Sequence, residues 1–145
     1  MNRPSRHLCI ATGQNLANLI PALQLSASEV LILETPAMRD AAVNLKRALE
    51  ARNIAVRRMP FDDTSPETIK ASAEGVAMEL GVEPLVFNAT GGHKLMTLAL
   101  AENLEELADD LHLVYAETRH DRLDWLKPLP SIDPMRDVLG IDDIL

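Results

Sequence analysis

The fold is decided by one stretch of sequence, Leu85-Val-Phe-Asn-Ala-Thr-Gly-Gly-His-Lys-Leu-Met-Thr-Leu-Ala-Leu-Ala101. It begins with three apolar residues, which is typical of a short buried strand, and passes through a glycine pair into an apolar run long enough for a helix. A strand followed by a turn and a helix is the building unit of α/β proteins. The rest of the chain contains the same unit several times.

Apolar segments of this kind predict strands over residues 7–11, 29–33, 54–61, 85–87, 111–116 and, more briefly, 123–126. Helices are expected between them, over residues 16–25, 35–52, 65–81 and 95–110. Two of these helices begin with a hydroxyl residue and a proline, Thr35-Pro36 and Ser65-Pro66, which favour the N-cap and the first helical position. The alternation indicates an α/β, Rossmann-like fold with a mostly parallel sheet of about six strands and helices on both faces.

The length of 145 residues suits a single domain. We expect its core to span about residues 7–126, and residues 127–145 to form an irregular acidic tail. The single cysteine, Cys9, lies in an apolar run and is expected to be a buried small hydrophobe. No signal peptide is recognisable and no apolar stretch is long enough to span a bilayer, so we expect a cytoplasmic protein.

The net charge of −8 is unevenly distributed. Residues 1–100 hold ten acidic and ten basic residues, whereas residues 101–145 hold twelve acidic and four basic ones. An acidic chain is a poor general binder of DNA or RNA, and only 3% of its residues are aromatic, which argues against a reader of single strands. A small anionic ligand remains compatible with this charge, because backbone N–H groups and one lysine can hold phosphates.

Two loops at the carboxyl ends of predicted strands carry unusual residues. One contains Thr12, Gly13, Gln14 and Asn15, with Asn18 one turn later; the other contains Asn88, Ala89, Thr90, Gly91, Gly92, His93 and Lys94. Ligands of open parallel sheets bind at this edge, where glycines permit close approach and helix N-termini offer N–H groups. Each loop alone is equally explained as a tight turn with a helix cap, but the pair favours a nucleotide site.

Known nucleotide and metal signatures are absent. Lys94 is followed by Leu95, so the phosphate loop of the Walker type lacks its Ser or Thr, and no Gly-x-Gly-x-x-Gly follows the first strand. No Cys/His cluster has metal spacing, so we expect neither a metal nor a cofactor. His7 and His112 lie in predicted strands and are expected to be structural, whereas His93 is placed where a ligand could meet it.

The start of the helix over residues 95–110 has almost no polar face through residue 101. A helix that is apolar all round is expected to be buried on all sides. In a domain of this size, that indicates a subunit interface in addition to the core.

The layout, together with Asn88-Ala-Thr-Gly-Gly-His-Lys-Leu-Met96, resembles the CARF domain, the CRISPR-associated Rossmann fold. The segment Thr12-Gly-Gln-Asn-Leu-Ala-Asn-Leu-Ile-Pro-Ala-Leu23 fits the same resemblance. The likeness covers most of residues 7–126 and is closest to the N-terminal sensor domain of CRISPR ancillary nucleases activated by cyclic oligoadenylate. His93 departs from the small hydroxyl residue expected between the glycine pair and the lysine.

This resemblance implies a homodimer that binds a ring of linked adenylates, with cyclic tetra-adenylate as the expected ring, across its two-fold axis. The implied role is that of a sensor in type III CRISPR antiviral signalling. The implied ring contacts are Asn88, Thr90, Gly91, Gly92 and Lys94, with Thr12, Gly13, Gln14 and Asn15 opposite. No direct contact with DNA, RNA or a membrane is expected.

Three functions remain open from the residues. The first is a sensor that relays dimer closure to an effector. The second is a metal-independent ring nuclease, in which a ribose 2′-hydroxyl attacks the adjacent phosphate and Lys94 and His93 are the candidate catalytic residues. The third is a Rossmann-like protein that binds another nucleotide. We expect binding to dominate, because the loops offer no evident acid–base pair.

No nuclease constellation, ribonuclease motif or basic DNA-binding helix follows the predicted sheet. The sequence is therefore interpreted either as a sensor domain of a longer protein or as a free-standing one, with the effector fused or separate.

Overall fold

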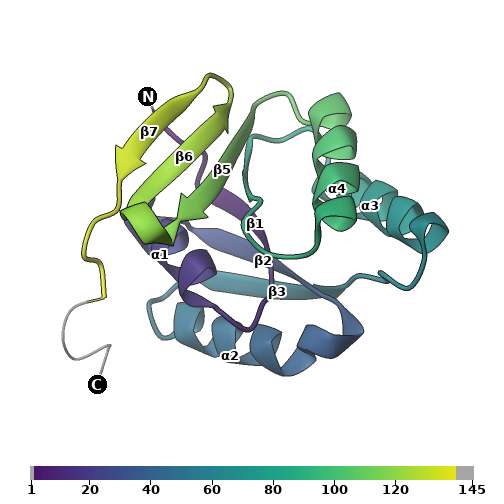
Figure 1. The fold of residues 1–145 in the computed structure, drawn as a ribbon, viewed down its shortest axis with the longest axis horizontal. Helices are drawn as coiled ribbons and strands as arrows, with labels where there is room; N and C mark the ends of the chain where they lie inside the picture. The colour runs from purple at the N-terminus through teal and green to yellow at the C-terminus, as the bar shows by residue number, and fades with distance from the viewer. Residues whose placement is uncertain (1, 140–145) are drawn as a thin grey trace.

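Seven strands form one sheet in the order β3-β2-β1-β4-β5-β6-β7 in the computed structural model, which describes residues 2–139 (Figure 1). The strands are β1 (Arg6–Ile10), β2 (Glu29–Glu34), β3 (Ala55–Pro60), β4 (Leu85–Asn88), β5 (Leu111–Glu117), β6 (Arg122–Lys127) and β7 (Ser131–Pro134). The first five pair in parallel, and β6 and β7 add antiparallel strands at one edge. The mostly parallel α/β sheet is confirmed.

Four α-helices cover the sheet: α1 (Leu16–Gln24), α2 (Arg39–Glu50), α3 (Pro66–Leu80) and α4 (Lys94–Leu107). The helices α1 and α2 lie on one face, and α3 and α4 lie on the other (Figure 1). Alternate residues of β1 and of the position after it face opposite layers, since Leu8 and Ile10 pack with α3 and α4 while Cys9 and Ala11 pack with α1 and α2. Burial on both faces explains why the central strands are continuously apolar.

The sequence predicted a helix over residues 35–52, and the structure divides it. A 3₁₀ turn, η1 (Pro36–Met38), precedes α2, and Thr35 makes no side-chain capping bond. Ser65, in contrast, caps α3 in a capping box with Thr68 and has Pro66 at the first helical position. The two helix starts therefore differ in their caps, since the Ser65 side chain accepts the Thr68 N–H whereas that of Thr35 accepts none.

Two other predictions are corrected. Residues 127–145 were expected to be irregular, but Ser131–Pro134 forms β7 and pairs with β6; the prediction for residues 140–145 lies outside the described residues. The sheet therefore has seven strands rather than about six. The start of α4 is not buried on all sides by this chain: Met96 and Leu100 are in the core, whereas Leu95 and Leu98 are 47% and 65% exposed.

Cys9 is buried, as the sequence predicted, and His7 and His112 lie in strands as expected and are also buried. Burial raises the pKa of the Cys9 thiol to about 12, which leaves it un-ionised at neutral pH. No helix among the described residues has both the length and the apolar character needed to cross a membrane.

His7 makes the stability of the fold depend on pH. Burial lowers its pKa to about 4, and a hydrogen bond with the Pro4 backbone offsets only part of this effect. Between about pH 6.5 and pH 4 the unfolded chain binds a proton that the folded chain excludes, so acidification favours unfolding. The stabilisation is complete above the unfolded pKa and is lost as the pH falls toward about 4.

We predict that the free energy of unfolding decreases by about 3 kcal/mol from this residue between pH 7 and pH 4. The substitution His7→Gln keeps an N–H donor but does not titrate, so it should flatten that part of the profile. Urea unfolding at a series of pH values measures both proteins. Parallel profiles for the wild type and His7→Gln would contradict the assignment to His7.

Candidate functional site

A pocket of about 570 Å³ opens at the carboxyl ends of the parallel strands. The residues from the two predicted loops that line it are Thr12, Gly13, Gln14, Thr90, Gly91, Gly92 and His93. Five other predicted site residues do not line the pocket: Asn15, Asn18, Asn88, Ala89 and Lys94. The structure thus brings the two loops together at one site, as the strand-end rule predicts.

The two loops touch through backbone, because Gly91 lies against the end of β1. A Cβ atom at Gly91 would lie 2.2 Å from the Ile10 carbonyl oxygen and 2.6 Å from Thr12 Cγ2. Gly92 adopts a positive φ of 77°, a conformation that side-chain-bearing residues rarely adopt. Both glycines of this pair are therefore required by the geometry, one for space and one for backbone conformation.

Buried amides connect the loops to the helix that follows β1. Asn18 Nδ2 donates to the Ile10 carbonyl oxygen at 2.8 Å, and Asn88 Nδ2 donates to the Ala17 carbonyl oxygen at 2.9 Å. Both asparagines are 2% exposed. Their amide groups are used within the protein, so they position the loops from below the pocket surface.

Thr90 extends this network to β5. Its hydroxyl donates to Asn88 Oδ1 at 2.6 Å and accepts the backbone N–H of Ala116 at 2.7 Å. The Thr90 N–H also donates to Asn88 Oδ1, at 3.1 Å. The glycine loop is therefore held from β4 on one side and β5 on the other.

The first loop is held by two other hydrogen bonds. The Gln14 N–H donates to Thr12 Oγ1, and Asn15 Nδ2 donates to the Ala41 carbonyl oxygen of α2. Asn15 Oδ1 is buried and has no hydrogen-bond partner among the described residues. Thr12 and Gln14 both line the pocket, so they are the polar residues that this loop presents to it.

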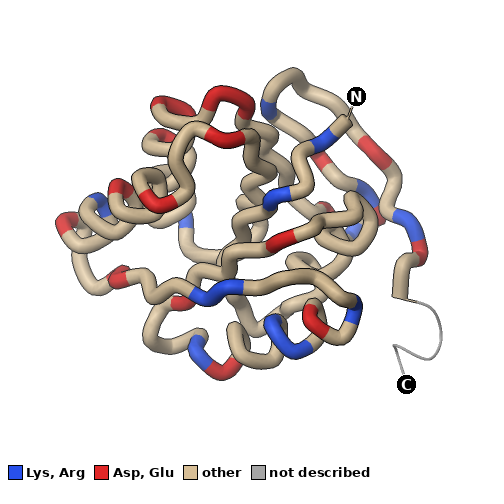
Figure 2. Tube along the Cα trace, turned by 180° about the vertical axis from the view of Figure 1, so that it is seen from behind, with Lys and Arg blue, Asp and Glu red and all other residues tan. Residues whose placement is uncertain are grey.

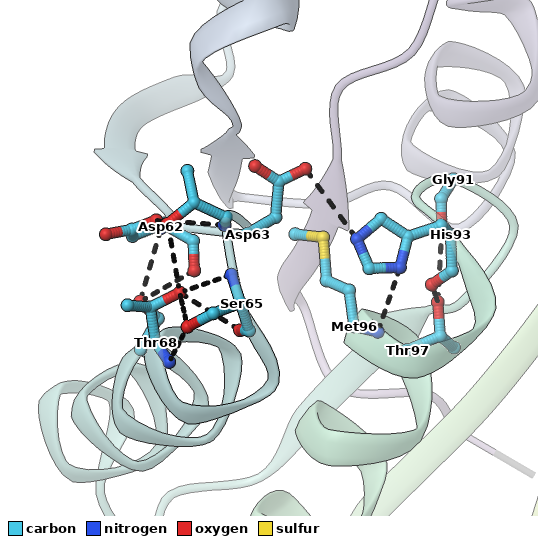
Figure 3. A network of polar contacts seen from close by, with 10 residues as sticks. Asp62, Asp63, Ser65, Thr68, Gly91, His93, Met96 and Thr97 are labelled. Carbon is cyan, nitrogen blue, oxygen red and sulfur yellow. Dashed lines mark hydrogen bonds and ion pairs between the residues drawn. The ribbon is translucent and has the colours of Figure 1, made fainter.

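His93 caps α4. Its Nδ1 accepts the Met96 N–H at 3.4 Å, and its Nε2 lies 3.6 Å from Asp63 Oδ2 (Figure 3). Because Nδ1 acts as an acceptor, the ring proton of the neutral histidine is on Nε2, on the side of Asp63. Lys94 is the first residue of α4 and is exposed at the rim, outside the lining of the pocket.

Several pocket residues were missed from the sequence. The most informative are Thr35 after β2, Asp63 after β3, and Tyr115 and Thr118 at the end of β5. All four lie near the carboxyl ends of strands, so the rule that located the glycine loops would have found them if it had been applied to every strand. Their segments lack a glycine pair, which is why they did not stand out.

The charged residues are unevenly distributed along the chain. Helices α3 and α4 carry six acidic residues and two lysines, whereas β3 and α2 carry five arginines and lysines and two acidic residues (Figure 2). Within the pocket lining, Asp63 is the acidic residue and His93 the titratable base. The described residues contain no group of three or more His, Cys, Asp or Glu side chains that could hold a metal ion.

No protein-family model matches the sequence. No curated protein matches it either.

Solved structures are similar to the chain in fold. The structure of Can2 from Sulfobacillus thermosulfidooxidans in complex with cyclic tetra-adenylate superposes with a TM-score of 0.80 and 18% sequence identity, over 97% of this chain and 40% of that one. Protein VC1899 from Vibrio cholerae gives a TM-score of 0.79 at 18% identity, over 91% of this chain and 36% of that one.

A third structure is that of a type III CRISPR defence DNA nuclease activated by cyclic oligoadenylate. It gives a TM-score of 0.62 at 19% identity, over 93% of this chain and 21% of that one. The chain thus spans at most about two fifths of the length of these proteins. The likeness confirms the fold that the resemblance to the CARF domain implies.

We predict that Gly91→Ala lowers the free energy of unfolding by about 1–3 kcal/mol, because its methyl group would overlap the Ile10 carbonyl and Thr12. Gly13→Ala is the matched control: it lies in the other loop, and a Cβ there meets nothing within 4 Å. Thermal and urea unfolding of the two variants measure the difference. Equal stability of Gly91→Ala and Gly13→Ala would show that the loops can separate without cost.

Proposed function

We propose that this chain is a CARF-type sensor domain that binds a cyclic oligoadenylate, with cyclic tetra-adenylate as the expected ring. One observation carries the proposal: the two glycine-containing loops line one pocket, in a fold shared over 97% of this chain with a protein solved with cyclic tetra-adenylate bound.

The chemistry of the pocket suits an adenylate. The helices α1 and α4 begin at the pocket, and the first N–H groups of a helix lack intrahelical partners and attract anions. Thr12, Gln14 and Thr118 supply neutral donors and acceptors for sugar hydroxyls or base edges. This arrangement explains how a chain with a net charge of −8 binds a phosphate-containing ring.

In this proposal Lys94 approaches the ring from the rim when the ligand is bound, and Gly91 and Gly92 let phosphate approach the backbone. The ring lies across a homodimer, and its binding is relayed to a fused or separate effector of type III CRISPR defence in the cytoplasm. This chain covers only part of the longer proteins of similar fold, so a link to an effector is proposed here and is not a feature of the structure.

We predict that Lys94→Ala weakens binding of cyclic tetra-adenylate about ten- to hundredfold, since a charged hydrogen bond contributes about 1.5–3 kcal/mol. Lys70→Ala, on the exposed surface of α3, is the control and should bind like the wild type. Isothermal titration with cyclic tri-, tetra- and hexa-adenylate measures the affinities and the preferred ring. Absence of binding by the wild type to all three rings would refute the proposed function.

The same incubations test the ring-nuclease alternative. His93 Nδ1 accepts the Met96 N–H at the start of α4, so the imidazole cannot take up a second proton there and pass one from Nε2 to a leaving oxygen without losing this cap. We therefore expect binding without multiple turnovers when labelled ring is followed over time with chelator present. Multiple turnovers by the wild type, lost in His93→Ala, would make the protein a ring nuclease.

A second prediction concerns the homodimer. Leu95 and Leu98 are exposed on α4, next to the glycine loop, and a ring of repeated units is suited to an isologous pair of identical loops. Light scattering should give twice the chain mass of 15.9 kDa. Leu98→Lys should give a monomer, whereas Met78→Lys, at a 76% exposed position on α3, should not. A monomeric wild type with and without ligand would contradict this prediction.

A further inference from the structure

One carboxylate in the pocket has no role in the proposal above. Asp63 lies in the loop after β3, lines the pocket and has a side chain that is 27% exposed. Its contact with His93 Nε2, at 3.6 Å, is longer than a hydrogen bond. Within residues 2–139 no protein group donates a hydrogen bond to this carboxylate, although a carboxylate can accept several.

The loop holds Asp63 in place through its neighbours. Phe61 is 1% exposed, and its N–H donates to the Glu34 carbonyl oxygen at 2.8 Å. The Asp62 carboxylate accepts the Thr64 N–H and hydroxyl, and Ser65 then caps α3. Figure 3 shows the result, in which Asp62 turns back on this loop while Asp63 points across to His93. Asp63 is thus presented to the pocket by a fixed backbone.

The charge of Asp63 gives the pocket two chemically different sides. The glycine loops and the starts of α1 and α4 present N–H groups, which favour phosphate. A half-buried carboxylate repels phosphate and favours hydrogen-bond donors instead. A nucleotide has both kinds of group, since its phosphate accepts hydrogen bonds and its sugar and base can donate them. Such a ligand is oriented by placing its phosphate at the loops and its donor at Asp63.

We propose that Asp63 is a specificity-determining residue that accepts a hydrogen bond from a donor on the sugar–base part of the bound nucleotide, either the adenine 6-amino group or a ribose 2′-hydroxyl. This inference rests on the proposed function, because it assumes an adenylate in the pocket. The shared chemistry is a neutral N–H or O–H donor directed at the carboxylate. His93 completes the wall of the pocket on this side, with its Nε2 proton facing the same carboxylate.

The test compares discrimination between ligands rather than affinity alone, because removal of a negative charge also changes the general attraction for phosphates. The probes are cyclic tetra-adenylate, its 2′-deoxy analogue and cyclic tetra-inosinate, in which an oxygen replaces the 6-amino group. The wild type should prefer cyclic tetra-adenylate about ten- to hundredfold over the analogue that lacks the donor. The analogue that is discriminated against identifies the donor.

The variants are Asp63→Asn and, as the control, Glu74→Gln at an exposed position on α3 outside the pocket. Asp63→Asn should reduce the preference to less than about threefold, and Glu74→Gln should keep it. Should Asp63→Asn not fold, Asp63→Ser removes the same charge with a smaller side chain. If the wild type binds cyclic tetra-adenylate and all variants discriminate equally, the role of Asp63 is refuted and the proposed function stands. If the wild type binds no cyclic oligoadenylate, the proposed function fails and this inference with it.

Discussion

The close approach of Gly91 to the carbonyl oxygen of Ile10 fixes the distance between the two loops of the pocket. Any Cβ atom at Gly91 would lie within 2.2 Å of that oxygen, so the backbone of one loop is pressed against the end of β1. The same carbonyl accepts a hydrogen bond from Asn18 Nδ2 at 2.8 Å. The Ile10 carbonyl oxygen, at the end of a central strand, therefore contacts both the glycine loop and α1 and fixes their relative positions.

That constraint divides the polar residues of the loops into two groups. Asn18, Asn88 and Thr90 satisfy one another and nearby backbone groups, and the burial of the two amides makes this satisfaction energetically necessary. Gln14 and the glycine backbone remain at the pocket surface. Asn18 and Asn88 are therefore structural residues. The two loops as a pair still form one pocket.

The sequence predicted what depends on local pattern and could not predict what depends on tertiary contact. Apolar runs located the central strands, and Ser65-Pro66 located the start of α3, because these signals lie within a few residues. Residues 131–134 have no apolar alternation, and they become a strand only because β6 offers an edge to pair with. Asp63 follows β3 at the sheet edge, far in sequence from His93, so its place in the pocket depends on the strand order β3-β2-β1-β4.

The helix α1 links the pocket to the last described part of the chain. Near the start of α1, the Ala17 carbonyl oxygen accepts a hydrogen bond from the Asn88 side-chain amide, so α1 is joined directly to the glycine loop. At its end Gln24 donates to the Pro134 carbonyl oxygen and accepts the Arg136 N–H, each by its side-chain amide. Between these two contacts α1 contains Pro21, which has no backbone N–H and therefore removes one hydrogen bond from the helix. A displacement of the loops that moves the start of α1 thus either moves residues 134–136 as well or is absorbed by bending at Pro21. The proposed sensor role depends on the first of these two responses, because only then does a change at the strand ends reach the residues after β7 through α1.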